Sequence, residues 1–310
     1  MRRVMMVLGI LILLGLSLWG AYAVTEPTLL QPGFDGSYTY TLLFETTYWL
    51  IPLAIILGVL ARSLIAGRRE AVVENGKVLR HDDVAFFEHW TNTLGGITLI
   101  VSGILLGFLF VPRFVQTQRA IGFALNAHFV GAFLLIFVVS FYLTDTFLTG
   151  RIKTHIPDFK RDFPKAMAHF LSWFGRAPKP KEGKFLSSEN FSFLLWLLFG
   201  GLLIITGALK ASAYVWEISA SVLGPATMVH DVAALLFMLL LVVHVITGTI
   251  LPESWGVAKA MLTDGYVSEK YAKEHHQLWY EEILKEEKDT QTKSAAVTQK
   301  TVTQPSKSKL

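Results

Sequence analysis

Long apolar segments alternate with shorter polar ones along most of this chain. The apolar segments cover about residues 4–23, 47–66, 85–111, 122–148, 191–209 and 227–251. A helix that crosses a bilayer needs about 17–25 residues, and each segment is close to or above that length. The pattern therefore predicts an all-α integral membrane protein.

The first apolar segment has two interpretations. It follows Arg2 and Arg3 and ends in Ala21-Tyr22-Ala23. A basic start, an apolar run and an Ala-x-Ala end are typical of a secretory signal peptide. The run is also long enough for a membrane anchor. We expect residues 1–23 to be a signal peptide or an anchor helix, and either one places residue 24 on the outer side.

Positive charge gathers in every second loop. Residues 24–46 contain no Lys or Arg, whereas the loop after the second segment carries Arg68, Arg69, Lys77 and Arg80. The loop of residues 150–189 carries nine such residues. Because loops rich in Lys and Arg stay in the cytoplasm, we expect a multi-pass protein of the bacterial inner membrane with a cytoplasmic C-terminus.

Composition narrows the chemistry. The chain is 52% hydrophobic, carries a net charge of +4 and has no cysteine. Absence of cysteine excludes disulfides, iron–sulfur clusters, thiolate zinc sites and covalent haem attachment. The positive charge lies in loops beside apolar segments and indicates no nucleic acid partner. No loop is long enough for a catalytic domain, so substrate chemistry is expected in a partner chain.

Four histidines lie inside apolar segments: His89, His128, His230 and His244. Ionisable residues at membrane depth are costly and point to function. His89 enters its segment from the cytoplasmic side, and His128 enters the next segment from the outer side. His230 and His244 are fourteen residues apart, about 21 Å along a helix axis, and face nearly the same way. Depth therefore pairs His128 with His230 near the outer face and His89 with His244 near the inner face.

Imidazoles from two facing helices, paired at two levels, are typical of a bundle that holds two axially ligated haems. The expected cofactors are two haem b groups, with all four histidines as iron ligands. Space beside the backbone is expected from glycines, namely Gly95, Gly96, Gly103, Gly107, Gly131 and Gly248. Two protein ligands leave iron no open position, which favours electron transfer over substrate chemistry.

Other interpretations of the histidines are open. Any one of them can be a packing or hydrogen-bonding residue. Zinc or di-iron sites need three or four ligands at one depth, and each level offers two histidines with few carboxylates. The histidines outside the apolar segments are expected at the surface: His81, His155, His169, His275 and His276.

The chain resembles the cytochrome b (gamma) subunit of respiratory membrane-bound formate dehydrogenases. The four membrane histidines match that family's haem ligands in order and spacing. The stretch GYVSEKYAKEHHQLWYEEI is similar to its cytoplasmic tail, and KFLSSENFSFLLWLLFGGLLIITG is similar to the segment leading into its third core helix. The resemblance covers roughly residues 82–285, and the two apolar segments at the N-terminus depart from it.

The expected fold is a four-helix transmembrane di-haem cytochrome b bundle, with the N-terminal signal peptide or anchor helix and one extra transmembrane helix. The expected parts are residues 1–23 (signal peptide or anchor), 24–84 (outer loop, extra helix and basic cytoplasmic loop), 85–251 (di-haem core), 252–287 (cytoplasmic tail of the family) and 288–310 (disordered tail).

The resemblance implies electron transfer from a periplasmic molybdenum or tungsten formate dehydrogenase subunit, through an iron–sulfur subunit and both haems, to menaquinone or ubiquinone near the cytoplasmic face. His244, Glu88 and Asp83 are candidates for quinone contact or proton delivery. Arg62, Arg151 and Lys153 are candidates for pairing with haem propionates, beside a solvated or lipid-facing role.

Two alternatives accompany this interpretation. Related cytochrome b subunits serve nickel–iron hydrogenases and sulfur-compound reductases. A haem-free membrane anchor or transporter is an alternative of another class.

Overall fold

The helices expected from the apolar segments are present in the computed structural model, which describes residues 2–25, 41–65, 67, 71–150 and 156–302. The chain divides into two units. The first comprises Met1–Arg68, Asp83–Ile156 and Ser192–Ile250, and the second comprises Arg69–Asp82, Pro157–Phe191 and Leu251–Leu310. Each unit is described by itself.

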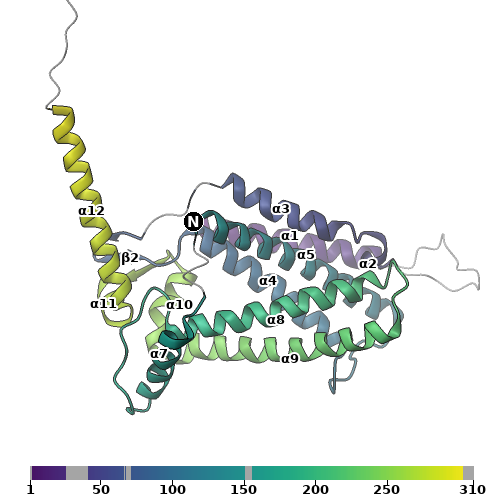
Figure 1. The fold of residues 1–310 in the computed structure, drawn as a ribbon. Coiled ribbons are helices and arrows are strands. Elements are labelled where there is room, and N and C mark those ends of the chain that lie inside the picture. Colours follow the sequence, from purple (N-terminus) through teal and green to yellow (C-terminus); the bar gives the residue numbers. More distant parts are fainter. Residues whose placement is uncertain (1, 26–40, 66, 68–70, 151–155, 303–310) are drawn as a thin grey trace, which may run out of the picture. The chain divides into compact units, whose positions relative to one another are not determined.

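The first unit is a helical bundle. Its helices are α1 (Arg2–Val24), α2 (Leu43–Thr46), α3 (Leu50–Leu64), α4 (Asp83–Leu106), α5 (Gln118–Leu148), α8 (Ser187–Ser212) and α9 (Ala220–Ile250). Helix α8 belongs to this unit from Ser192 on. The long helices run side by side (Figure 1). Among the described residues, α1, α5, α8 and α9 are long and apolar enough to cross a membrane. Helix α4 has 24 residues and is less apolar, because Glu88, His89 and Asn92 lie in its first half.

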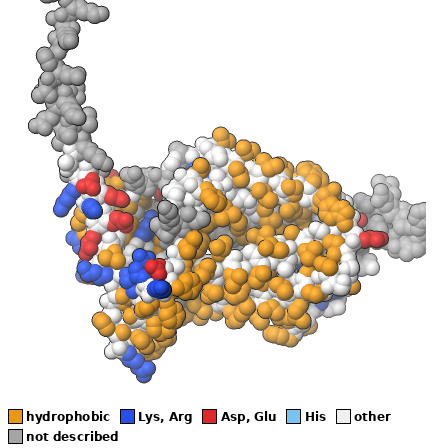
Figure 2. Space-filling model, in the orientation of Figure 1, with side chains coloured by type: hydrophobic (Ala, Val, Ile, Leu, Met, Phe, Trp, Pro, Cys, Tyr) orange, Lys and Arg blue, Asp and Glu red, His pale blue; other side chains and the backbone are white. Residues whose placement is uncertain are grey.

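Apolar side chains cover the surface of this bundle. Figure 2 shows hydrophobic side chains over its helices, with few charged ones among them. Leu13 on α1 and Ile205 on α8 are 67% and 68% exposed. A continuous apolar surface of this kind is costly in water and suits lipid. The expected all-α membrane fold is confirmed, and the protein is a multi-pass membrane protein.

Helix α3, the extra helix of the sequence prediction, packs tightly on α5. A Cβ on Gly58 would lie 2.3 Å from the Phe137 carbonyl oxygen, so only glycine fits at this crossing. One turn further on, Arg62 Nε donates to Asp145 Oδ1 at 2.7 Å, and both side chains are almost fully buried. Burial makes this ion pair a strong constraint, since either charge alone at this depth is costly.

Helix α1 also packs against bundle helices. Arg3 Nε donates to Asp83 Oδ1 of α4 at 3.1 Å, and the Tyr22 ring meets Phe123 of α5 edge to face at 5.7 Å. Thr25, which follows α1, is fully buried. These contacts fit the anchor-helix alternative for residues 1–23.

Close backbone approach in the described bundle is concentrated on α5. Helices α3 and α4 lie close to α5 along much of their length, and α1 does so over a shorter stretch. The backbones of α8 and α9 come close to their neighbours at few points, and their contacts are made by side chains such as Trp196 and Phe237, whose ring centres are 4.5 Å apart. Wide spacing of this kind leaves room between helices.

The second unit contains a small sheet that the apolar pattern did not predict. Strands β1 (Val73–Glu74), β2 (Lys77–Leu79) and β3 (Tyr266–Ser268) form an antiparallel sheet in that order. The unit's helices are α7 (Phe159–Ser172), the 3₁₀ turn η1 (Pro252–Ser254), α10 (Trp255–Leu262), α11 (Glu269–His275) and α12 (Gln277–Val302). Its core is formed by Val78, Ala260, Val267, Ala272, Trp279, Tyr280 and Ile283.

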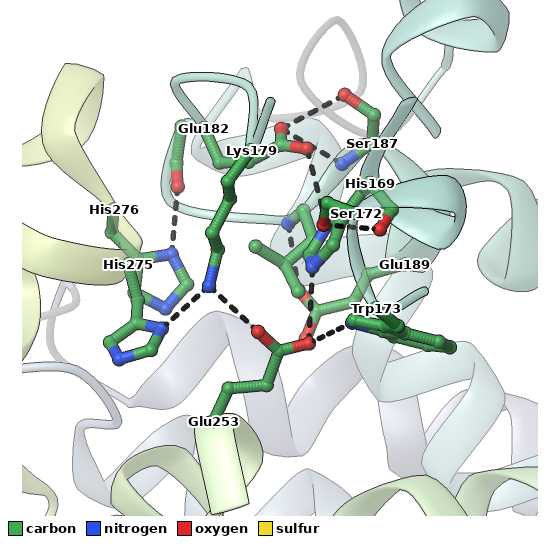
Figure 3. Close-up of polar contacts among 12 residues, drawn as sticks. His169, Ser172, Trp173, Lys179, Glu182, Ser187, Glu189, Glu253, His275 and His276 are labelled. Atoms are coloured by element: carbon green, nitrogen blue, oxygen red, sulfur yellow. Dashed lines mark hydrogen bonds and ion pairs between the residues drawn. The ribbon is translucent and has the colours of Figure 1, made fainter. Parts of the chain in front are cut away.

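A polar cluster centred on His169 lies in this unit (Figure 3). His169 Nε2 lies 3.1 Å from Glu253 Oε1, and its Nδ1 lies 3.6 Å from Glu182 Oε1. Glu253 also accepts hydrogen bonds from Lys179 and the Trp173 indole. The carboxylates of Glu182 and Glu253 raise the pKa of His169 against the opposing effect of burial.

His276 is the second buried histidine of this unit. Its Nδ1 donates to the Gly183 carbonyl at 2.9 Å, and its ring meets Trp279 edge to face. Burial lowers its pKa to about 3, and the charge of Arg80 acts in the same direction. Both His169 and His276 are 1% exposed. The expectation of surface positions was therefore wrong for these two, while His155 lies outside the described residues.

The first part of the expected disordered tail is helical in the structure. Residues from 288 on were expected to be disordered, whereas α12 continues to Val302. This part contains Lys, Gln and Ala, which have high helix propensity, beside several Thr residues, which have a lower one. An α-helix satisfies its backbone hydrogen bonds internally. Residues 303–310 lie outside the described residues.

Candidate haem sites

The four membrane histidines meet in two pairs. His89 of α4 and His244 of α9 have ring centres 6.3 Å apart, and His128 of α5 and His230 of α9 have ring centres 6.5 Å apart. These are the pairs that helical depth predicts, because α9 carries one member of each. That these pairs hold haem iron stays a prediction.

The ring separations fit a metal ion between each pair. A metal–imidazole bond is about 2.0 Å and the ring centre lies about 1.1 Å behind the nitrogen, so two imidazoles on opposite sides of one iron have centres about 6.2 Å apart. Two rings joined directly by a hydrogen bond of about 3 Å would have centres about 5 Å apart. The observed 6.3 Å and 6.5 Å match the first arrangement and exceed the second.

A hydroxyl group fixes the His128 ring. Ser102 Oγ of α4 lies 2.9 Å from His128 Nδ1. The single hydroxyl hydrogen of Ser102 is directed to the carbonyl oxygens of Thr98 at 2.7 Å and Leu99 at 3.1 Å. With its hydrogen directed to these carbonyls, the serine oxygen accepts from Nδ1–H. This assigns the proton of neutral His128 to Nδ1 and leaves the Nε2 lone pair for a metal.

His230 is held in the same way from the preceding helix. Thr206 Oγ1 of α8 lies 2.9 Å from His230 Nδ1, and its hydroxyl donates to the Leu202 carbonyl at 2.6 Å. The same reasoning assigns the proton to Nδ1 and leaves Nε2 free. Both members of this pair therefore present the nitrogen suited to axial ligation.

Aromatic rings surround the other pair. The His89 ring meets Trp90 edge to face at 5.6 Å, and the His244 ring meets Trp196 of α8 edge to face at 6.3 Å. His244 is the most exposed of the four histidines. The two pairs thus have different surroundings, one with hydroxyl partners and one with indole rings.

A cavity of about 390 Å³ opens beside the His128–His230 pair. Cavities of this size are typical of cofactor sites, and its lining is mostly apolar. The glycines in its wall are Gly96, Gly103, Gly107, Gly200 and Gly207. A Cβ on Gly207 would lie 3.2 Å from His230 Cε1, so a side chain at this position would crowd the His230 ring.

The glycines that were expected to make room for haem have different surroundings. Gly96, Gly103 and Gly107 line the cavity. Gly95 and Gly131 instead serve helix contact, since a Cβ on Gly131 would lie 2.9 Å from Leu99 Cγ. Gly248 lies four residues after His244, outside this cavity, and a Cβ there would meet no atom within 4 Å. Gly200 and Gly207 of α8, which line the cavity, were not among the expected glycines. Glycine is common in membrane helices, so the sequence does not show which of them face a cofactor.

Lys210 is the single positively charged residue among those lining this cavity. Its Nζ lies 3.8 Å from Asp231 Oδ1, and Asp231 Oδ2 accepts from the Leu109 backbone N–H at 3.4 Å. The distance between Lys210 and Asp231 is long for an ion pair, so the ammonium group can bind a second anion. Its position in the sequence does not indicate such a role, because one lysine at a helix end is common.

Other predicted residues have different roles. Arg62 pairs with Asp145, and Asp83 pairs with Arg2 and Arg3. Arg62 was a candidate for pairing with a haem propionate, and its ion pair with Asp145 occupies it instead. Glu88 is buried in α4. Arg151 and Lys153 lie outside the described residues.

Comparison with known proteins identifies the family. The family model described as prokaryotic cytochrome b561 matches residues 80–264, which is more than half of the chain. The chain belongs to this family. Cytochromes b561 bind haem b, so the protein is a membrane b-type cytochrome of electron transfer. No curated protein was found to match the chain. The match begins after α1, α2 and α3, so these helices are additions to the cytochrome core.

The residues of this cytochrome fit haem b. Each histidine pair would supply two nitrogen ligands, and the porphyrin would supply the other four. Among the described residues, no group of three or more His, Cys, Asp or Glu is placed to hold a metal ion without such a cofactor. Ring spacing fits this donor set at both pairs. At His128–His230 the hydroxyl contacts and the glycine-lined cavity support it as well.

Proposed function

We propose that this cytochrome is the di-haem membrane subunit of a formate dehydrogenase complex. His128 and His230 hold the haem near the outer face, and His89 and His244 hold the haem near the cytoplasmic face. The chain carries electrons from a periplasmic iron–sulfur subunit to menaquinone or ubiquinone near the cytoplasmic face of the bacterial inner membrane. The C-terminus and the second unit are cytoplasmic.

The pairing of the four rings carries this proposal. Bound haem would supply a one-electron carrier, and two histidine ligands would leave its iron no open position for substrate. The histidines of α9 lie about 21 Å apart along the helix, so the two carriers occupy opposite halves of the membrane. Each electron moved inward against the membrane potential stores about 2.3 kcal/mol per 100 mV.

Neighbouring side chains orient the two histidine rings of the His128–His230 site. Ser102 and Thr206 keep both Nε2 atoms directed at the iron position, since their oxygens bind the opposite ring nitrogens at 2.9 Å. Lys210, which lines the cavity, would compensate the charge of a haem propionate. Carboxylates buried in an apolar cavity need such a partner.

The formate dehydrogenase assignment is supported by the spacing of the histidines and by the tail. The tail forms β3, α11 and the start of α12, whose buried Trp279 and Tyr280 belong to the core of the second unit. The catalytic subunit would contain molybdenum or tungsten. A nickel–iron hydrogenase or a sulfur-compound reductase is the alternative partner, since cytochromes of this family serve more than one kind of dehydrogenase. Membership of a cytochrome family argues against a haem-free anchor or transporter.

The partner is tested in native membranes. Formate added to anaerobic membranes that contain the chain should reduce its b-type haems, and hydrogen gas should not. Affinity purification of the tagged chain should then recover an iron–sulfur subunit and a molybdenum or tungsten subunit. Reduction by hydrogen, together with recovery of a nickel–iron subunit, would contradict the formate assignment and favour the alternative.

A further inference from the structure

An aromatic segment that precedes the cytochrome core reaches the His128–His230 site. It comprises α2 and the start of α3, and it lies before residue 80, where the family match begins. Phe44 and Tyr48, together with Ile51 and Pro52, line the same cavity as His128 and His230. The cavity wall is thus shared between the core and an element that is additional to it.

Asn126 fixes this segment in place. Its Oδ1 accepts from the Leu43 backbone N–H at 2.8 Å, and its Nδ2 donates to the Thr41 carbonyl at 2.9 Å. The same amide nitrogen lies 3.4 Å from Thr25 Oγ1, and the side chain is fully buried. Asn126 lies two residues before His128 on α5. The helix that carries a predicted ligand therefore also anchors the segment.

Aromatic contacts then join the segment to the connection between α8 and α9. The Phe44 ring stacks on Tyr214 with centres 5.8 Å apart at 19°, and its edge meets Phe129 at 5.0 Å. The Tyr48 ring meets Trp216 edge to face at 5.7 Å. Tyr214 and Trp216 also line the cavity. We call these four residues, Phe44, Tyr48, Tyr214 and Trp216, the aromatic wall.

We propose that the aromatic wall limits the access of water to the haem at His128–His230 and thereby raises its reduction potential. This inference rests on the proposed function, since it needs haem at that pair. Ferric iron in a porphyrin dianion with two neutral imidazoles carries one more positive charge than ferrous iron. An apolar wall disfavours that charge, and water stabilises it. Opening the wall therefore stabilises the ferric state.

The test compares the purified full-length cytochrome with the Phe44→Ala/Tyr48→Ala variant. Ile56→Ala on α3 is the matched control, because Ile56 is 54% exposed and does not line the cavity. A milder variant, Phe44→Leu/Tyr48→Leu, keeps apolar side chains and covers the case in which the alanine variant does not fold. The measurements are haem content, redox titration of each haem, and the rate at which aqueous ferricyanide removes one electron from each ferrous haem.

In the opened variant, both haems should remain, one midpoint potential should fall, and ferricyanide should oxidise that same haem several-fold faster. The second haem and the Ile56→Ala control should not change. Unchanged potentials and oxidation rates in variants that hold two haems would overturn the aromatic wall and leave the proposed function intact. A wild-type protein without haem at His128–His230 would instead overturn both.

Discussion

Ser102 Oγ lies 2.9 Å from His128 Nδ1, and its own hydrogen is committed to the backbone of α4. Thr206 repeats this relationship with His230 from α8. In each case a hydroxyl on one helix fixes the tautomer of a histidine on the next helix. The two halves of the candidate site are thus built by the same device, although their sequences differ.

Removal of these hydroxyls should alter one haem only. A hydrogen bond accepted from Nδ1–H increases the basicity of a ligating imidazole, and loss of such a partner typically weakens metal binding by about 10–100-fold. We expect Ser102→Ala and Thr206→Val to weaken retention of the same haem and to raise its potential. Redox titration and haem content after gel filtration measure both effects.

Matched variants separate this role from simple packing. Thr98→Val removes a hydroxyl from the same helix that bonds only to the Leu94 carbonyl, and it should leave both haems unchanged. Ser102→Thr keeps the hydroxyl and should restore the potential. An equal shift in Thr98→Val and Ser102→Ala would show that the hydroxyl of Ser102 has no special role.

Gly207 provides a steric test of the same site. Its missing Cβ would lie 3.2 Å from His230 Cε1, so Gly207→Val should displace the ring and remove or weaken one haem. Gly201→Val is the control, because a Cβ there meets no atom within 4 Å. The absorbance of the reduced α-band per chain is the measurement. Two intact haems in Gly207→Val would contradict the placement of His230.

The buried pair of Arg62 and Asp145 should stabilise the attachment of α3 to α5. Arg62→Met leaves the Asp145 carboxylate buried without its partner, which typically costs about 3–5 kcal/mol. The Arg62→Met/Asp145→Asn double variant removes both charges and should recover a large part of that loss. Thermal unfolding in detergent compares the two. Equal midpoints for the single and double variants would show that the charges are not coupled.

The second unit should be most stable near pH 6.5. The raised pKa of His169 contributes stability that is fully present below the unfolded value of about 6.5 and is lost as pH rises through the folded pKa. The pKa of His276, lowered to about 3, contributes stability that is present above about 6.5 and is lost as pH falls toward the folded value. The two effects oppose each other and produce a maximum.

Hydrogen–deuterium exchange of peptides from residues 266–284 measures this profile. His169→Gln should flatten its alkaline side and His276→Gln its acidic side. Lys270→Gln is the control, since that side chain is 83% exposed. If neither histidine variant changes this pH profile, the protonation of His169 and His276 does not contribute to the stability of the unit.

The sequence predicted the bundle and the ring pairs because both depend on helical geometry. A rise of 1.5 Å and a turn of about 100° per residue place His230 and His244 at two depths on one face. Depth alone then selects His128 and His89 as their partners, and the structure brings those rings together. No knowledge of side-chain contacts was needed.

The parts that were missed depend on contacts between distant residues. Strand β3 pairs with β2 across almost 190 residues of chain, and His169 meets Glu253 across 84 residues. Loop histidines were therefore expected at the surface. Lys210 and Gly207 were missed for a similar reason, because their value depends on which helix face meets His230. The ion pair of Arg62 and Asp145 was not predicted either, because the two residues lie in different apolar segments.

Four alanine variants test the central claim most directly, namely that two pairs of imidazoles each hold one haem. Low-temperature spectra and redox titrations should show that His128→Ala and His230→Ala lose one and the same haem. His89→Ala and His244→Ala should lose the other haem and keep the first. Loss of a common haem in His89→Ala and His128→Ala, or two haems retained in any of the four variants, would contradict the account.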